Sequence, residues 1–228
     1  MSQPMQPIYL FADSQLLFWK RDGIAFLDSI RALCPGNAPK AAYIGASNGD
    51  APEFYDIFLA AMDGIGIGDC RMIRAEYSSE EAAFLEEADL IVLAGGDVEK
   101  GWMVFEQTGI KETLIRRYNN GAALIGVSAG AVQLGLYGAV ETAESSHRLI
   151  DTFKFVPFIV SAHDEDREWQ ELTSIIQLME GTARGIGIPK GTGVIYHPDR
   201  SIEVIRGFAH EFSMANGKMV RELLLPKE

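Results

Sequence analysis

The sequence is poor in cysteine and in positive charge, and it has no long apolar run. Two cysteines, Cys34 and Cys70, are too few for a disulfide framework in 228 residues, and neither belongs to a CxxC pair. We interpret them as buried thiols in a reducing cytoplasm. Lysine and arginine total 20 against 32 acidic residues, which gives a formal net charge of −12. Nucleic acid and anionic membranes are therefore disfavoured as partners, because both attract positive charge.

The apolar segments are short throughout. None reaches the roughly 18 residues that a membrane span requires. Residues 1–7 show neither the basic start nor the apolar core of a signal peptide. We therefore expect a cytoplasmic protein without a membrane partner, and a homo-oligomer is compatible with this sequence.

Strand-like and helix-like segments alternate through the first part of the chain. Apolar strands are expected at residues 8–12, 41–45, 71–74, 90–93 and 122–126. Helices are expected at residues 16–33, 52–62, 78–88 and 98–119, the last broken at Gly109. Apolar strands separated by helices predict an α/β fold, a three-layer sandwich whose mostly parallel central sheet is covered on both faces.

The second part of the chain has a looser pattern. Residues 138–155 are polar and irregular, residues 158–160 predict a core strand, and residues 165–180 predict a helix. Beyond Gly185, short strand-like runs separated by turns predict hairpins or edge strands. No linker or repeat interrupts the chain, so we expect one domain over residues 1–228.

The most informative motif is G-x-S-x-G at Gly126, Ser128 and Gly130. It lies between an expected strand and an expected helix, where this motif forms a sharp turn that exposes the serine hydroxyl. The alternative is a small-residue turn with an incidental serine. The flanking strand and helix favour Ser128 as a nucleophile at the carboxyl end of a parallel strand.

A serine nucleophile needs a base, and the chain has four histidines: His147, His163, His197 and His210. His163 follows the strand at 158–160, so it also lies at the carboxyl end of a strand, on the same edge as Ser128. The alternative is that His163 caps the next helix. His147 is expected in a polar loop, His197 in a turn, and His210 away from this edge.

Acyl transfer also needs hydrogen-bond donors for the oxyanion. Gly95, Gly96 and Asp97 form a glycine-rich turn after the fourth strand, and the backbone N–H groups of the turn could point toward Ser128. The alternative is a simple turn in which Asp97 caps a helix. The histidines are scattered, no HExxH occurs and no dinucleotide fingerprint is present, so we expect neither metal nor cofactor.

The turn at residues 94–97, the elbow at residues 126–131 and the strand ending in His163 together resemble peptidase E and cyanophycinase. These are serine peptidases on a fold related to the class I glutamine amidotransferases. The resemblance implies Ser128 as nucleophile and His163 as base. It also implies an oxyanion hole from Gly95, Gly96 and the amide of Ala129. The implied substrate is a small peptide cleaved next to an aspartyl or β-aspartyl residue.

Four positions depart from the family pattern. Lys190 stands where peptidase E has a glutamate that completes the triad, and lysine cannot accept a hydrogen bond from the imidazole. Val127 stands where peptidase E has tryptophan. Ser161-Ala162 precedes the histidine, where peptidase E and cyanophycinase have Asn-Pro or Asp-Gln. Another carboxylate therefore orients His163, or the site is a dyad, or the protein is impaired. The candidate carboxylates are Glu141, Glu144, Asp164 and Asp199.

Selection of an aspartyl side chain requires a cation, and arginine can bind a carboxylate through two hydrogen bonds. Arg167, four residues after His163, is the first candidate, and an arginine on a solvated helix face is the alternative. Arg148 and Lys154 are weaker candidates. Asp97 is the second residue predicted to contact substrate.

Two other functions are weighed. One is an α/β-hydrolase esterase with the order Ser128, Asp199, His210. It is disfavoured because this chain lacks the HGGG-type oxyanion segment of such enzymes. The other is a non-catalytic binding or regulatory member of the same fold, which Lys190 motivates. A glutamine amidotransferase is disfavoured because the elbow carries serine and not cysteine.

Overall fold

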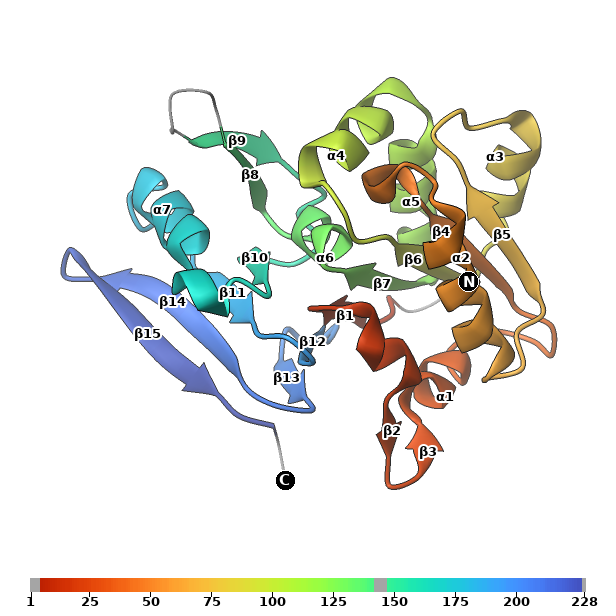
Figure 1. Ribbon diagram of the computed structural model, residues 1–228, viewed down its shortest axis with the longest axis horizontal. Coiled ribbons are helices and arrows are strands. Elements are labelled where there is room, and N and C mark those ends of the chain that lie inside the picture. Colours follow the sequence, from red (N-terminus) through yellow and green to blue (C-terminus); the bar gives the residue numbers. More distant parts are fainter. Residues whose placement is uncertain (1–4, 142–146, 227–228) are drawn as a thin grey trace.

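The computed structural model describes residues 5–141 and 147–226 (Figure 1). A central sheet has seven strands in the spatial order β13-β12-β1-β7-β6-β4-β5. Their bounds are β1 Ile8–Phe11, β4 Lys40–Ile44, β5 Asp69–Ile73, β6 Leu90–Leu93, β7 Ala123–Val127, β12 Gly193–Tyr196 and β13 Ile202–Ile205. The five strands from β1 to β5 in that order are parallel, whereas β12 and β13 are antiparallel. The predicted, mostly parallel central sheet is confirmed.

Helices cover both faces of this sheet. Their bounds are α1 Phe26–Arg31, α2 Pro52–Asp63, α3 Ser79–Leu85, α4 Val98–Gln107, α5 Ile110–Asn119 and α6 Ala129–Leu134. Along β1, Ile8 and Leu10 join the core under α3 to α6, whereas Tyr9 and Phe11 join the core under α1 and α2. Successive side chains of a strand point to opposite faces, so a wholly apolar strand feeds two cores. This arrangement gives the three layers.

A second, four-stranded sheet lies beside the first (cyan and blue in Figure 1). Its order is β10-β11-β14-β15, with bounds Ile159–Ala162, Gly185–Ile188, Ala209–Ala215 and Lys218–Leu224. Helix α7 (Gln170–Leu178) packs on it through a third core that contains Trp169, Leu172 and Phe212. β14 and β15 form a hairpin that turns at Asn216–Gly217, and β12 and β13 form another, as the turn residues predict.

Two predicted helices are wrong in extent. Residues 16–33 form a short 3-10 helix (Ser14–Phe18), a hairpin of β2 (Lys20–Arg21) and β3 (Ile24–Ala25), and then α1. Asp22 and Gly23 both have positive φ in the tight turn between the strands, so turn chemistry overrides the helical spacing. Residues 165–180 split into a 3-10 helix (Glu165–Arg167) and α7, because Glu168 and Trp169 adopt positive φ.

The segment predicted to be irregular contains a hairpin. β8 (Tyr137–Glu141) pairs antiparallel with β9 (His147–Asp151). Other predictions are confirmed: α4 and α5 are separated at Gly109, and Ser78 and Glu81 form a capping box at the start of α3.

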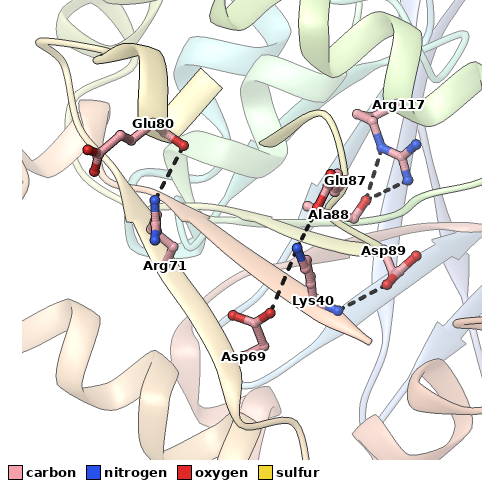
Figure 2. Close-up of polar contacts among 8 residues, drawn as sticks. All are labelled: Lys40, Asp69, Arg71, Glu80, Glu87, Ala88, Asp89 and Arg117. Atoms are coloured by element: carbon pink, nitrogen blue, oxygen red, sulfur yellow. Dashed lines mark hydrogen bonds and ion pairs between the residues drawn. The ribbon is translucent and has the colours of Figure 1, made fainter. Parts of the chain in front are cut away.

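Polar contacts tie together the strand ends opposite the candidate site (Figure 2). The backbone N–H of Lys40, at the start of β4, donates to Asp89 Oδ2 at 3.0 Å, just before β6. Arg117 of α5 donates twice to the carbonyl oxygen of Ala88, at 3.0 and 2.8 Å. These structural contacts stabilise the amino ends of the strands. Ligands of open α/β sheets bind at the opposite, carboxyl ends.

No described helix is long and apolar enough to cross a membrane. Within residues 5–141 and 147–226, no group of three or more His, Cys, Asp or Glu residues is placed to hold a metal ion. Cys34 is buried, Cys70 is half-buried, and both are free thiols. Burial raises the pKa of each to about 11, as expected for unreactive cysteines.

Candidate active site

Ser128 sits in a strained turn between β7 and α6. Its backbone has φ +50° and ψ −111°, a conformation that costs on the order of 1–3 kcal/mol for a residue other than glycine. The two glycines of the motif make the turn sterically possible. A Cβ at Gly126 would lie 2.6 Å from the nitrogen of Ala131, and one at Gly130 would lie 2.3 Å from the oxygen of Leu93. The strand, turn and helix predicted for the elbow are all observed.

His163 lies against Ser128. Its Nε2 is 2.7 Å from Ser128 Oγ, within hydrogen-bonding distance. The expectation that both residues share one sheet edge is wrong, because β10 pairs with β11 in the second sheet. Instead, Leu136, just after α6, donates its N–H to the oxygen of Phe158, just before β10, at 3.1 Å. Helix α6, which begins just after Ser128, packs on β10, which ends just before His163, and the pair forms across this contact.

The other histidines lie elsewhere. His210 in β14 is 8% exposed and its Nε2 is 2.8 Å from Arg221 Nη2. Burial, and then the positive charge of Arg221, lower the pKa of His210. His197 lies 3.0 Å from Glu203 Oε2, and only the backbone of His147 is described. Of the three histidines whose side chains are described, only His163 contacts Ser128.

Unpaired backbone donors surround Ser128. Among the described residues, none accepts a hydrogen bond from the backbone N–H of Gly95, Gly96 or Ala129. Gly95 is so close that a Cβ there would lie 3.3 Å from Ser128 Cβ. Gly96 has φ +136°, and a Cβ there would lie 2.2 Å from the oxygen of Ser47. Free N–H groups next to a nucleophile are the components of an oxyanion hole.

A pocket of about 250 Å³ opens on Ser128 and His163. It lies between the ends of the strands and helix α2 (Pro52–Asp63). Its walls are mainly apolar, and they include Leu17, Tyr43, Phe54, Ile57, Phe58 and Val127.

The two residues predicted to contact substrate do not line this pocket. Asp97 caps helix α4, where its Oδ1 accepts a hydrogen bond from the N–H of Lys100 at 2.8 Å. The Arg167 side chain is 59% exposed, and its Nε lies 3.7 Å from Asp164 Oδ1. The weaker candidates, Arg148 and Lys154, form ion pairs with Glu99 and Asp151.

Lys190 is exposed and contributes to a second pocket, which Arg206, His210 and Arg221 also line. Its backbone N–H donates to Glu165 Oε1 at 3.0 Å. Glu165 is not among the carboxylates that the sequence pattern singled out, although it lies only two residues after His163. Its other carboxylate oxygen, Oε2, is buried and has no hydrogen-bond partner among the described residues.

The other candidate carboxylates are placed as follows. Asp164 Oδ2 is also buried, with no hydrogen-bond partner in the described part of the chain. Asp199 accepts a hydrogen bond from the N–H of Ser201 within the turn between β12 and β13. Glu144 lies outside the described residues, and the side chain of Glu141 is not described.

Comparison with known proteins agrees with this fold. The model of peptidase family S51 matches residues 19–204. A peptidase from an acI-B1 Actinobacterium superposes with a TM-score of 0.69 at 17% identity, covering 95% of this chain and 96% of that one. A putative peptidase E protein from Listeria monocytogenes EGD-e gives a TM-score of 0.63 at 16% identity, covering 89% and 99%. No curated protein sequence matches the chain significantly. The family model covers most of the chain, which therefore belongs to peptidase family S51.

Proposed function

We propose that this protein is a serine peptidase of small peptides, with Ser128 as nucleophile and His163 as general base. The observation that carries the proposal is the 2.7 Å contact between Ser128 Oγ and His163 Nε2 at a strained strand-to-helix turn. Nucleophile and base within hydrogen-bonding distance are the signature of covalent catalysis. Membership of peptidase family S51 supports a serine-type peptidase.

The mechanism follows from this arrangement. His163 Nε2 accepts the proton of Ser128 Oγ as the oxygen attacks the scissile carbonyl carbon. The N–H groups of Gly95, Gly96 and Ala129 stabilise the negative oxygen that forms. His163 then gives the proton to the departing amine, and an acyl-enzyme remains on Ser128. Water, deprotonated by His163, hydrolyses this ester and restores the serine.

The orienting carboxylate in this proposal is Glu165. Because Nε2 of His163 faces Ser128, the remaining ring nitrogen, Nδ1, is the one that a carboxylate must orient. Glu165 is anchored to the backbone of Lys190, where the resemblance expects a glutamate, and its Oε2 has no described partner. Asp164 is the weaker candidate, because Arg167 lies 3.7 Å from its Oδ1.

Glu165→Gln is expected to lower kcat by roughly 10²-fold or more, since losing the triad carboxylate costs about 10⁴ in the best-studied serine protease. The acid limb of the pH–rate profile should also move to lower pH, because an amide does not stabilise the imidazolium ion. A merely structural role would not move that limb. Steady-state kinetics from pH 5 to 9 measure both effects.

Asp164→Asn and Lys190→Glu are the matched controls for Glu165. Each is expected to change kcat by less than about 3-fold, because Lys190 contacts Glu165 through its backbone N–H, which the substitution keeps, and Asp164 has a cationic neighbour. A large gain of activity in Lys190→Glu would show that the site lacks an orienting acid. Glu165 would then lose its role as the orienting acid in the proposed mechanism.

The aspartyl preference implied by the resemblance is also part of the proposal, with Arg167 as the cation for the substrate carboxylate. Arg167→Met is then expected to lower kcat/KM for aspartyl dipeptides by about 10-fold or more, and for neutral dipeptides very little, because the carboxylate loses its counter-charge. A small and equal loss on both substrates would assign Arg167 to the solvated surface. Arg148→Met, which likewise removes an exposed arginine that lies beside an acidic residue, here Glu99, is the matched control.

A further inference from the structure

We propose that the pocket opening on Ser128 receives an apolar, uncharged side chain from one of the two residues joined by the scissile bond. Preferred substrates would then carry a branched aliphatic or aromatic residue at that position. This inference rests on Ser128 being the nucleophile of the proposed function, but not on the aspartyl preference. An aspartyl residue, where the substrate has one, belongs on the other side of the bond.

The position of the pocket ties it to the scissile bond. Ser128, His163, Gly95 and Gly96 belong to its lining, so a carbonyl group held for attack lies at its mouth. At about 250 Å³ it is below the roughly 300–1,000 Å³ of sites that enclose drug-sized ligands. It therefore suits a single side chain and not a longer stretch of peptide.

Apolar side chains form its depth. Phe58 and Val92 are 0% and 1% exposed, and Leu17 and Val127 are also buried. Phe54 is 46% exposed on α2 and lines the same pocket. Desolvating an apolar side chain against these walls is favourable in proportion to the area removed from water.

The charges in the lining oppose an acidic occupant. Asp13 is the only carboxylate among the described residues that line the pocket, and no lysine or arginine is among them. Asp13 Oδ1 accepts a hydrogen bond from the N–H of Gln15, and Oδ2 accepts one from Gly191. A substrate carboxylate placed here would lose its hydration without gaining a cation, and it would face a like charge.

Two neutral polar side chains of the lining, Tyr43 and Asn48, are already engaged in hydrogen bonds. Asn48 Nδ2 donates to Tyr43 Oη at 2.8 Å, and Asn48 Oδ1 accepts from the N–H of Ala51 at 3.3 Å. Burial raises the pKa of Tyr43 to about 12, so this phenol is neutral. A polar substrate side chain would therefore compete with hydrogen bonds that the protein already makes.

The test is a peptide series in which each of the two residues at the bond is in turn Leu, Phe, Ala, Asp or Lys. At one of the two positions, Leu or Phe is expected to exceed both Asp and Lys in kcat/KM by about 10-fold or more, the range that hydrophobic pockets achieve. Labelling of Ser128 by a fluorophosphonate, read by mass spectrometry, is measured in parallel. Labelling and hydrolysis without an apolar preference would overturn this inference alone. Absence of both would overturn the proposed function and the inference with it.

Two variants locate the preference in the pocket. Val127→Trp should fill it, lowering kcat/KM for the Leu and Phe peptides by about 10-fold more than for the Ala peptide. Ile24→Trp places the same ring on the β2–β3 hairpin, 66% exposed and outside the pocket, and should change nothing. Phe54→Ala truncates an exposed wall residue without emptying the core, and should weaken the preference for large side chains several-fold. An unchanged preference in whichever of the two pocket variants folds would overturn the assignment.

Discussion

Ser128→Ala is expected to lower kcat/KM on peptide substrates by at least about 10³-fold, because the members of a catalytic serine site fail as a unit. The variant removes the Oγ atom that lies 2.7 Å from His163 and leaves the turn around it intact. Far-UV circular dichroism and thermal unfolding should match the wild type. Hydrolysis is followed by release of free amino groups from Asp-X, β-Asp-X and neutral dipeptides.

Ser174→Ala provides the matched control for Ser128→Ala. Ser174 is half-buried on α7, where its hydroxyl donates to the oxygen of Gln170, so the same atom is removed at a residue that does not line the pocket. Full activity is expected there, together with unchanged fluorophosphonate labelling of Ser128. Turnover near the wild-type level in Ser128→Ala would end the peptidase mechanism. A correctly folded wild type that hydrolyses none of the peptides would favour a non-catalytic role.

The parallel layers could be predicted because their signals are local. Apolar runs such as residues 90–93 and 122–126, each followed by a helix, leave only a doubly covered sheet as a way to bury them. The predicted break at Gly109 and the capping box at Ser78 succeeded for the same reason, since each depends on residues adjacent in sequence.

The sequence-based predictions are wrong where a tight turn or a contact between distant segments determines the local structure. The helical spacing of residues 16–33 hid a hairpin, because the two turn residues Asp22 and Gly23 outweigh the periodicity around them. The second sheet could not be foreseen either. Nothing local to β10 says that it pairs with β11, or that β11 in turn pairs with β14, because these partner strands come 20 or more positions later in the chain.

The candidate site divides in the same way. The elbow at Ser128 is encoded by its own glycines, and the strand before His163 is encoded by its apolar run. Their contact, however, depends on helix α6 packing against β10 of the second sheet. The sequence had suggested instead that both residues lie on one edge of the same sheet. Glu165 and the apolar pocket come from residues brought together only by folding, which is why sequence analysis considered neither. The catalytic roles of Ser128 and His163 stay predictions until the variants are measured.

His163→Ala should be as damaging as Ser128→Ala, whereas His210→Ala should keep activity within about 3-fold once normalised to folded protein. The reason is position: His163 Nε2 reaches Ser128 Oγ, and His210 is buried among Trp169, Phe212 and Arg221. His210→Ala should instead lower thermal stability, since it removes a buried ring. The reverse pattern, with His210 essential and His163 dispensable, would support the α/β-hydrolase order Ser128, Asp199, His210.

The double variant Ser128→Ala/His163→Ala separates a catalytic pair from two independent contributions. If His163 acts only by deprotonating Ser128 and by protonating the amine that leaves the tetrahedral intermediate formed on Ser128, removing His163 from Ser128→Ala costs nothing further. The double variant is then expected to match Ser128→Ala within about 3-fold. Two losses of about 10³ that multiplied would mean that each residue acts on the substrate by itself. The residual rate of all three variants measures what the N–H groups of Gly95, Gly96 and Ala129 and substrate binding supply without a nucleophile. Non-additive kinetics would therefore establish the 2.7 Å contact as one catalytic unit.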